Sequence, residues 1–171
     1  VTFLKGNTNI GTDGVSYPTD YDESKLSEGA TTPKIVHPGF KLGNRELTGI
    51  WVAKFEASSV QGNSNSTSGD NVTSKTVQVK PGVSSWRNIE IGNMYTVCKM
   101  YNSTLNSHMM KNDEWGALAY LSRSKYGKND EVTINGSSSY YTGGGTENAY
   151  ATTNTAQSTT GNVCGVYDMS G

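Results

Sequence analysis

The stretch Asn-Asp-Glu-Trp-Gly-Ala-Leu-Ala-Tyr-Leu-Ser-Arg, residues 112–123, carries the strongest structural signal in the sequence. Asn112 is a favourable N-cap, and Asp113 and Glu114 complement the positive end of a helix dipole in the first turn. A broad apolar face follows at helical spacing, formed by Trp115, Leu118, Ala119, Leu121 and Ser122. Gly127 is placed to end the element. The pattern predicts an amphipathic helix that begins at Asn112.

A second helix is predicted upstream, after Pro81-Gly82 interrupts the preceding segment. Ser84 or Ser85 can cap this helix, because a serine hydroxyl accepts a hydrogen bond from the first backbone N–H groups. The side chains that recur at helical spacing are Trp86, Ile89, Asn93 or Met94, Val97, Cys98 and Tyr101.

Short strands are predicted on both sides of these helices. The clearest covers residues 49–57, where Trp51, Ala53 and Phe55 alternate with their neighbours at the period of a strand. Further strands are expected at residues 76–79, 131–134 and 163–168.

Three segments lack any sustained period. Residues 58–74 consist largely of Ser, Asn, Gly and Thr, which bury too little apolar surface to offset their ordering entropy, and they predict an exposed, mobile loop. Residues 136–160 have a similar composition. Residues 1–45 carry scattered Gly and Pro and are expected to form an extended arm or linker. Residues 46–171 then form one domain.

The overall composition favours strands over long helices. Apolar residues make up 33% of the chain and charged residues 17%, and the gap is filled by Gly, Ser, Thr and Asn. A net charge of -1 without a basic stripe argues against nucleic acid as a partner. Because no apolar run approaches the roughly 20 residues that cross a bilayer, membrane insertion is not expected. The first residues lack a signal-peptide pattern, which predicts a mature or trimmed product.

Cysteine and histidine are too sparse to suggest a catalytic or metal centre. Cys98 and Cys164 are not spaced as a zinc site; they either pair or stay separately buried. His37 and His108 have no metal-ligand spacing either. No catalytic residue, metal ligand or cofactor is therefore predicted. Calcium is left open, since oxygen ligands such as Asp168 are present but no spacing singles them out.

The best candidate for ligand binding is the segment 136–160. Tyr140, Tyr141 and Tyr150 are embedded there among Ser, Gly and Asn. Binding loops favour this mixture, because it combines rigid aromatic area with adaptable hydrogen bonding. The alternative is a plain surface loop whose tyrosines pack on the domain, since loops carry function mainly where a scaffold fixes them.

Four blocks of sequence, taken in order, resemble blocks of one known family. Residues 161–171, Gly-Asn-Val-Cys-Gly-Val-Tyr-Asp-Met-Ser-Gly, resemble its block Gly-Leu-Tyr-Asp-Met-x-Gly. Residues 109–120 occupy the place of its Leu-Pro-Thr-Glu-Ala-Glu-Trp-Glu-Tyr-Ala-Ala. Residues 49–57 are similar to its strand ending Lys-Tyr-Glu-Val-Thr, and residues 83–86 and 95–98 are similar to its Val-Ser-Trp helix ending Tyr-Cys. Together these blocks resemble the formylglycine-generating-enzyme branch of the C-type-lectin-like domains.

The resemblance implies an α+β, C-type-lectin-like fold, in which two helices pack on small twisted antiparallel sheets with long loops, preceded by the extended arm. The expected core anchors are Trp51, Trp86, Trp115 and Tyr167. The family block continues beyond the position of Gly171 into Asn-Val-Trp-Glu-Trp, and the catalytic cysteines of the formylglycine-forming enzyme lie in that later part. The resemblance therefore predicts a non-catalytic domain that is cut short at its C-terminus.

These observations favour a non-catalytic extracellular recognition module on a phage particle, such as a tail, or on a bacterial surface. Its partner would be a surface protein or glycan receptor, as in adhesion. One alternative is a structural subunit of a virion or extracellular filament, assembled through residues 1–45 onto a neighbour's sheet edge. Another is a fragment of a formylglycine-generating-type enzyme. Self-association or assembly into a larger particle is expected.

Overall fold

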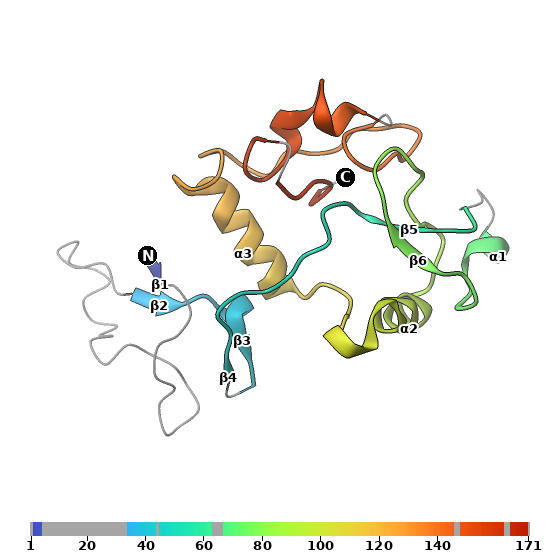
Figure 1. Ribbon diagram of the computed structural model, residues 1–171, viewed down its shortest axis with the longest axis horizontal. Helices are drawn as coiled ribbons and strands as arrows, with labels where there is room; N and C mark the ends of the chain where they lie inside the picture. The colour runs from blue at the N-terminus through green and yellow to red at the C-terminus, as the bar shows by residue number, and fades with distance from the viewer. Residues whose placement is uncertain are drawn as a thin grey trace. The chain divides into compact units, whose positions relative to one another are not determined.

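The computed structural model describes residues 2–4, 34–43, 45–62, 67–145, 148–162 and 165–170. The chain forms two compact units, Val1–Trp51 with Lys111–Ala117, and Val52–Met110 with Leu118–Gly171. Helices and small separate sheets make the structure α+β, as predicted (Figure 1). The arm and domain predicted for residues 1–45 and 46–171 stay predictions, because most of residues 1–33 lie outside the described part.

The described part of the first unit holds short strands and the 3-10 helix η2: β1 (Thr2–Leu4), β2 (Lys34–Val36), η2 (Pro38–Phe40), β3 (Lys41–Leu42) and β4 (Arg45–Glu46). β1 pairs with β2 in parallel, whereas β3 and β4 form an antiparallel pair. His37 caps η2, because its Nδ1 accepts a hydrogen bond from the Gly39 N–H at 3.1 Å. A Cβ at Gly39 would lie 2.6 Å from the carbonyl oxygen of Asp113, so this turn needs glycine.

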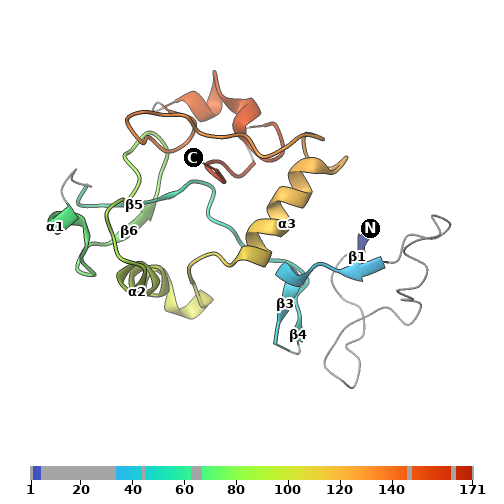
Figure 2. The same cartoon turned by 180° about the vertical axis from the view of Figure 1, so that it is seen from behind.

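The second unit contains most of the regular structure: β5 (Ala57–Ser59), α1 (Thr67–Asp70), β6 (Val77–Val79), α2 (Ile91–Tyr101), η3 (Ser103–Leu105), η4 (Ala149–Ala151) and η5 (Thr155–Gln157). β5 and β6 form an antiparallel pair in which Ser58 lies opposite Gln78. α2 packs against β6, and the two lie side by side in both views (Figures 1 and 2). The strand predicted at 76–79 is thereby confirmed as β6.

Helix α3 (Asn112–Arg123) confirms the strongest sequence signal, and it begins at the predicted residue. Its Ser122 is fully buried and donates a hydrogen bond to the carbonyl oxygen of Asp130 at 3.0 Å. Gly127 follows in a turn, where its N–H donates to the carbonyl oxygen of Ser124. A Cβ at Gly127 would lie 2.1 Å from the carbonyl oxygen of Leu121, so the chain can turn this tightly only with glycine.

Helix α2 begins later than the sequence predicts, at Ile91 rather than after Ser84 or Ser85. Asn88 has a left-handed backbone with φ +55°, which a right-handed helix cannot contain. The backbone N–H of Trp86 donates instead to the carbonyl oxygen of Ala57 at 2.9 Å. In place of the predicted N-terminal turns of this helix, residues 84–90 form hydrogen bonds with distant parts of the chain.

Three of the predicted strands do not form as predicted among the described residues. Residues 49–56 belong to no strand, with bends at Lys54 and Phe55, and only Ala57 of the predicted strand belongs to β5. Residues 131–134 contribute a single bridge, from Ile134 to Ser170. The strand predicted at 163–168 does not form over residues 165–168, and residues 163–164 lie outside the described part. Alternation of side chains thus misled where no partner strand is present to form a ladder.

The core of the second unit is aromatic. Phe55 and Tyr167 are buried at 7% and 1% exposure, and their rings lie 5.6 Å apart. Trp86, at 8% exposure, is buried as well. Trp51 is fully exposed and Trp115 is 41% exposed, so neither is the core anchor that the resemblance implied. Trp51 lies in the segment 49–56, outside any strand, and Trp115 lies in the first turn of α3.

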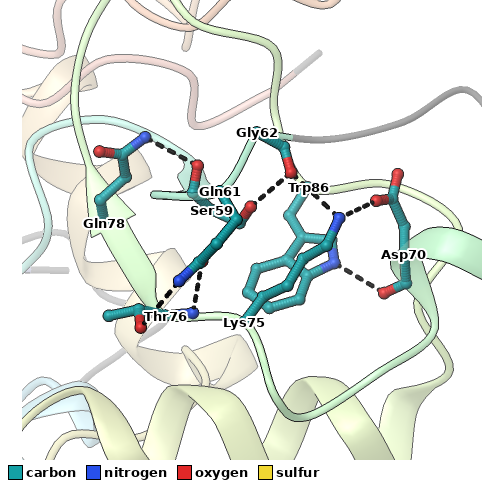
Figure 3. A network of polar contacts seen from close by, with 8 residues as sticks. All are labelled: Ser59, Gln61, Gly62, Asp70, Lys75, Thr76, Gln78 and Trp86. Atoms are coloured by element: carbon teal, nitrogen blue, oxygen red, sulfur yellow. Dashed lines mark hydrogen bonds and ion pairs between the residues drawn. The ribbon is translucent and has the colours of Figure 1, made fainter.

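The segment 58–74 was predicted to be an exposed, mobile loop, and this prediction is wrong for its described parts, which are hydrogen-bonded and partly buried. Ser59 and Asp70 are 1% and 0% exposed. Lys75 Nζ lies 2.7 Å from Asp70 Oδ1 and donates to the carbonyl oxygen of Gly62 at 3.0 Å, and Trp86 Nε1 donates to the carbonyl oxygen of Asp70 (Figure 3). Polar residues can be buried when hydrogen bonds satisfy them, and composition does not reveal those partners.

Candidate recognition site

The candidate site is the loop 135–145, which is fastened to residues 80–87 by a run of backbone hydrogen bonds. Tyr141 forms an antiparallel bridge with Ser84. Next to this bridge, the Ser85 N–H donates to the carbonyl oxygen of Tyr140, and the Thr142 N–H donates to the carbonyl oxygen of Val83, each at 2.9 Å. The loop tip is therefore held as if it were a short strand, although neither side was predicted as one.

Buried Thr142 adds a side-chain bond to this attachment. Its hydroxyl is fully shielded from solvent and donates to the carbonyl oxygen of Lys80 at 2.6 Å. On the other side of the tip, the Tyr140 N–H donates to the carbonyl oxygen of Ser137 at 3.0 Å and closes a turn. Tyr140 has φ +58°, a conformation that non-glycine residues adopt only where their surroundings impose it.

Asp168 holds the base of the loop through hydrogen bonds to its carboxylate. Its Oδ2 accepts a hydrogen bond from the Gly143 N–H at 2.7 Å, and its Oδ1 accepts one from Asn135 Nδ2 at 2.8 Å. Asn135 Nδ2 also donates to the carbonyl oxygen of Tyr141 at 2.8 Å. We call Asn135 and Asp168 the latch. Asp168 itself has φ +60°, so it turns the chain while its carboxylate faces the loop.

The loop presents two tyrosines to solvent above this latch. The side chains of Tyr140 and Tyr141 are 53% and 40% exposed. Arg87 lies against Tyr140, with its Cζ 3.9 Å from the ring centroid, which is within cation–π distance. We call Tyr140, Tyr141 and Arg87 the tyrosine surface. Nothing in the sequence singles out Arg87, because a single arginine outside any period gives no signal of its own.

Tyr150, the third predicted ligand-binding residue, takes a different position. Its ring lies 5.1 Å from that of Phe55 and 6.1 Å from that of Tyr167, both with edge-on geometry. Its carbonyl oxygen accepts a hydrogen bond from the Tyr167 hydroxyl at 2.7 Å. Lys54 Nζ lies 5.3 Å from the Tyr150 ring centroid. The structure thus joins Tyr140 and Tyr141 in one surface and gives Tyr150 a packing contact in the aromatic core.

One carboxyl group beneath the loop, that of Glu56, has a raised pKa. Partial burial raises the pKa of Glu56, the negative charge of Asp168 raises it further, and a hydrogen bond from Ser85 opposes both effects. The Glu56 N–H also points toward Asp168 Oδ2, at 3.4 Å. The carboxyl group of Glu56 therefore lies close to the Asp168 carboxylate that holds the loop.

The groups that could support other chemistry lie in separate places. Burial raises the pKa of the Cys98 thiol, which disfavours a reactive thiolate. Burial lowers the pKa of His37, and Asp113 opposes that effect. His108 Nδ1 lies 2.9 Å from the carbonyl oxygen of Asn106 on the surface. Within the described ranges, His, Cys, Asp and Glu form no group of three or more that could hold a metal ion.

A pocket of about 190 Å³ opens elsewhere in the second unit, beside α2. It is lined by Thr73, Ser74, Lys75, Thr76, Val77, Val97, Met100 and Tyr101. Lys75, its one charged lining residue, already forms the ion pair with Asp70, so the pocket presents mainly hydroxyl and apolar groups. Among the described helices, none is both long and apolar enough to cross a lipid bilayer.

Comparison with known proteins adds no relative: no protein-family model, curated sequence or solved structure matches this chain.

Proposed function

We propose that this protein is a non-catalytic recognition module that binds its partner through the tyrosine surface. The observation that carries the proposal is that Tyr140 and Tyr141 are exposed on a loop whose backbone is fixed on both sides. Exposed aromatic side chains on a mobile loop would have to be ordered on binding. Here the attachment to residues 83–85 and the latch hold the backbone that carries these side chains, which lowers the entropic cost of binding.

The residue types of the surface support the same proposal. Tyrosine and arginine are enriched among the residues that contribute most to protein interfaces. Tyrosine offers a large rigid face together with a hydroxyl, and Arg87 adds charge beside it. Aromatic faces and hydroxyls also suit sugars, so a glycan receptor and a surface protein are both within the proposed class of partners.

The proposed setting is extracellular, on a phage particle or a bacterial surface, and the proposed fold is C-type-lectin-like. Both rest on the resemblance of four sequence blocks to the formylglycine-generating-enzyme branch. The α+β structure with helices α2 and α3 is compatible with that fold. Assembly into a larger particle belongs to the same proposal.

The test compares exposed tyrosines inside the loop 135–145 with an exposed tyrosine outside it. The full chain is applied to a printed panel of glycans and to intact bacterial cells, and bound ligands are titrated with three variants. We expect Tyr140→Ala and Tyr141→Ala each to weaken binding by about tenfold or more, equivalent to about 1.4 kcal/mol. Tyr126→Ala is the matched control, since Tyr126 is 76% exposed but lies outside the loop.

The proposal fails if both loop variants bind as tightly as the wild type. It also fails if Tyr126→Ala weakens binding by the same factor, because binding would then depend on surface tyrosines in general. Absence of wild-type binding to every glycan and cell in the two panels would count against it as well.

A further inference from the structure

Asn135 occupies a demanding position in the latch, because every polar atom of its side chain is engaged. Nδ2 donates to the Tyr141 carbonyl oxygen and to Asp168 Oδ1, both at 2.8 Å. Oδ1 accepts a hydrogen bond from the Ser137 N–H at 3.1 Å. The backbone N–H of Asn135 donates to the carbonyl oxygen of Ser170 at 2.7 Å. The amide therefore connects the loop tip to the segment that carries Asp168.

The residue that follows Asn135 makes this amide chemically vulnerable. An asparagine side chain can be attacked by the backbone nitrogen of the next residue, and asparagine is thermolabile for this reason. Glycine hinders this attack less than any other residue in the following position, because Gly136 has no side chain beside its nitrogen. It is exposed, and a Cβ built on it would meet no atom within 4 Å.

We propose that Asn135 is a modification site, at which deamidation opens the latch and releases the loop 135–145. The Gly136 nitrogen, after losing its proton to hydroxide, bonds to Asn135 Cγ; the Cγ–Nδ2 bond breaks and ammonia leaves. Water then opens the resulting succinimide to aspartate or isoaspartate. The reaction consumes one water and releases one ammonia, and it needs no oxidant, reductant or enzyme.

The product cannot make the contacts of the latch. A carboxylate has acceptors and no donor, whereas both partners of Asn135 Nδ2 are themselves acceptors. The new carboxylate would also face the carboxylate of Asp168, which like-charge repulsion disfavours. Isoaspartate would in addition lengthen the backbone beside the bridge between Ile134 and Ser170. The loss of attachment falls on the loop that carries Tyr140 and Tyr141.

The same contacts control when the reaction occurs. Ring closure requires Asn135 Cγ to bond to the Gly136 nitrogen and Nδ2 to leave, whereas the bonds to Tyr141 and Asp168 hold Nδ2 in place. An intact latch therefore slows deamidation, and a loosened latch accelerates it. As a control of ligand binding this inference rests on the proposed function, whereas the reaction and the opening of the loop do not.

The first experiment follows Asn135 by peptide mass spectrometry while the full chain is incubated at neutral pH. We expect Gly136→Ala to slow its deamidation severalfold, because a methyl group hinders the attacking nitrogen in a place where it disturbs nothing else. We expect Asp168→Gly to accelerate it severalfold, since glycine accepts the left-handed backbone of that position while removing the carboxylate. Asn106, followed by Ser107, is the internal control for general unfolding and should keep its rate.

Any other order of the three rates at Asn135 would overturn the proposed gating. An equal acceleration at Asn106 in Asp168→Gly would also overturn it, because global unfolding would then explain the result.

The second experiment measures the opening of the loop without a ligand. Limited chymotrypsin digestion after Tyr140 and Tyr141 should be faster in deamidated wild type and in Asn135→Asp, whereas cleavage after exposed Tyr126 should be unchanged. The aged wild type, separated by its extra negative charge, keeps the test valid if Asn135→Asp fails to fold. Unchanged cleavage at the loop in aged protein would overturn the release of the loop. Because neither readout uses a receptor, failure of the proposed recognition function would leave both results interpretable.

Discussion

Asp168 accepts a hydrogen bond from the Gly143 N–H at 2.7 Å, although 25 residues separate the two in the sequence. This bond fixes the start of the glycine run 143–145, where each residue has positive φ, from 73° to 113°. Together with the bond from Asn135 Nδ2 to Asp168 Oδ1, it places the carboxylate of Asp168 beneath the loop. The relationship gives Asp168 a positioning role, from which the first prediction follows.

Asp168→Gly should lower the free energy of unfolding by roughly 3 kcal/mol, because it removes charged hydrogen bonds to Gly143 and Asn135 while keeping the backbone conformation allowed. Urea denaturation of the full chain measures the change. Asp130→Gly is the control: its side chain is 75% exposed in a loose pair with Arg123 and should contribute less than about 1 kcal/mol. Equal effects of the two substitutions would contradict the latch.

Removing the carboxylate of Asp70 should cost more. Asp70 is fully buried and pairs with Lys75 Nζ at 2.7 Å, so Asp70→Ala leaves a lysine whose side chain is 18% exposed without its counter-ion. Breaking such a pair from one side costs about 3–5 kcal/mol, and we expect a loss near the lower end because Lys75 can reach water. Thermal and urea unfolding measure it. A loss below about 1 kcal/mol, the range of exposed ion pairs, would show that this segment is not ordered as described.

Two glycines should respond to alanine with opposite signs. Gly127→Ala should destabilise the protein by about 1–3 kcal/mol or more, because the new Cβ would lie 2.1 Å from the carbonyl oxygen of Leu121. Gly92→Ala, within α2 and with no atom within 4 Å of the new Cβ, should stabilise it by about 0.5–1 kcal/mol. Denaturation midpoints report both. The same sign in both variants would contradict the geometry of α2 or of the turn after α3.

Glu56 should make stability fall as the pH rises. Its pKa is raised by partial burial and by Asp168, so the folded protein holds this proton to a higher pH than the unfolded chain does. The resulting stabilisation is fully present below the ordinary glutamate pKa and is lost as the pH rises through the raised value. Glu56→Gln, which cannot ionise, should remove this dependence and increase stability at neutral pH relative to the wild type. Urea titrations across this pH range test it, and parallel curves for wild type and variant would refute it.

Local signals in the sequence predicted some elements well. α3 begins at Asn112 and carries Asp113 and Glu114 in its first turn as expected, because helix-dipole effects act within one turn and need no distant partner. β6 was predicted for a similar reason, since Val77 and Val79 alternate over a short run. The predicted N-cap role of Asn112 is wrong, since the Lys111 carbonyl oxygen accepts the hydrogen bond from the Trp115 N–H and Asn112 is the first helical residue. The strand at 49–57 failed, because alternation indicates a strand only where another strand is present to pair with it.

The candidate site was predicted only in part. Aromatic residues among Ser, Gly and Asn drew attention to Tyr140, Tyr141 and Tyr150, but composition cannot say which rings face solvent. The structure exposes the first two and packs Tyr150 against Phe55. Arg87 joined the surface without any sequence signal, because its contact with Tyr140 depends on how the chain returns after some fifty residues.

By itself the sequence determined the mixture of helix and strand, the position of α3, and the absence of a recognisable metal spacing, because these depend on neighbouring residues and on composition. Tertiary structure alone decided that Asp70 is buried, that the segment before α2 is not helical, and that Asn135 and Asp168 meet beneath the loop. Hydrogen bonds between residues 33 positions apart, like the one that joins those two side chains, leave no periodic trace in a sequence. They form only when the whole chain has brought their donors and acceptors together.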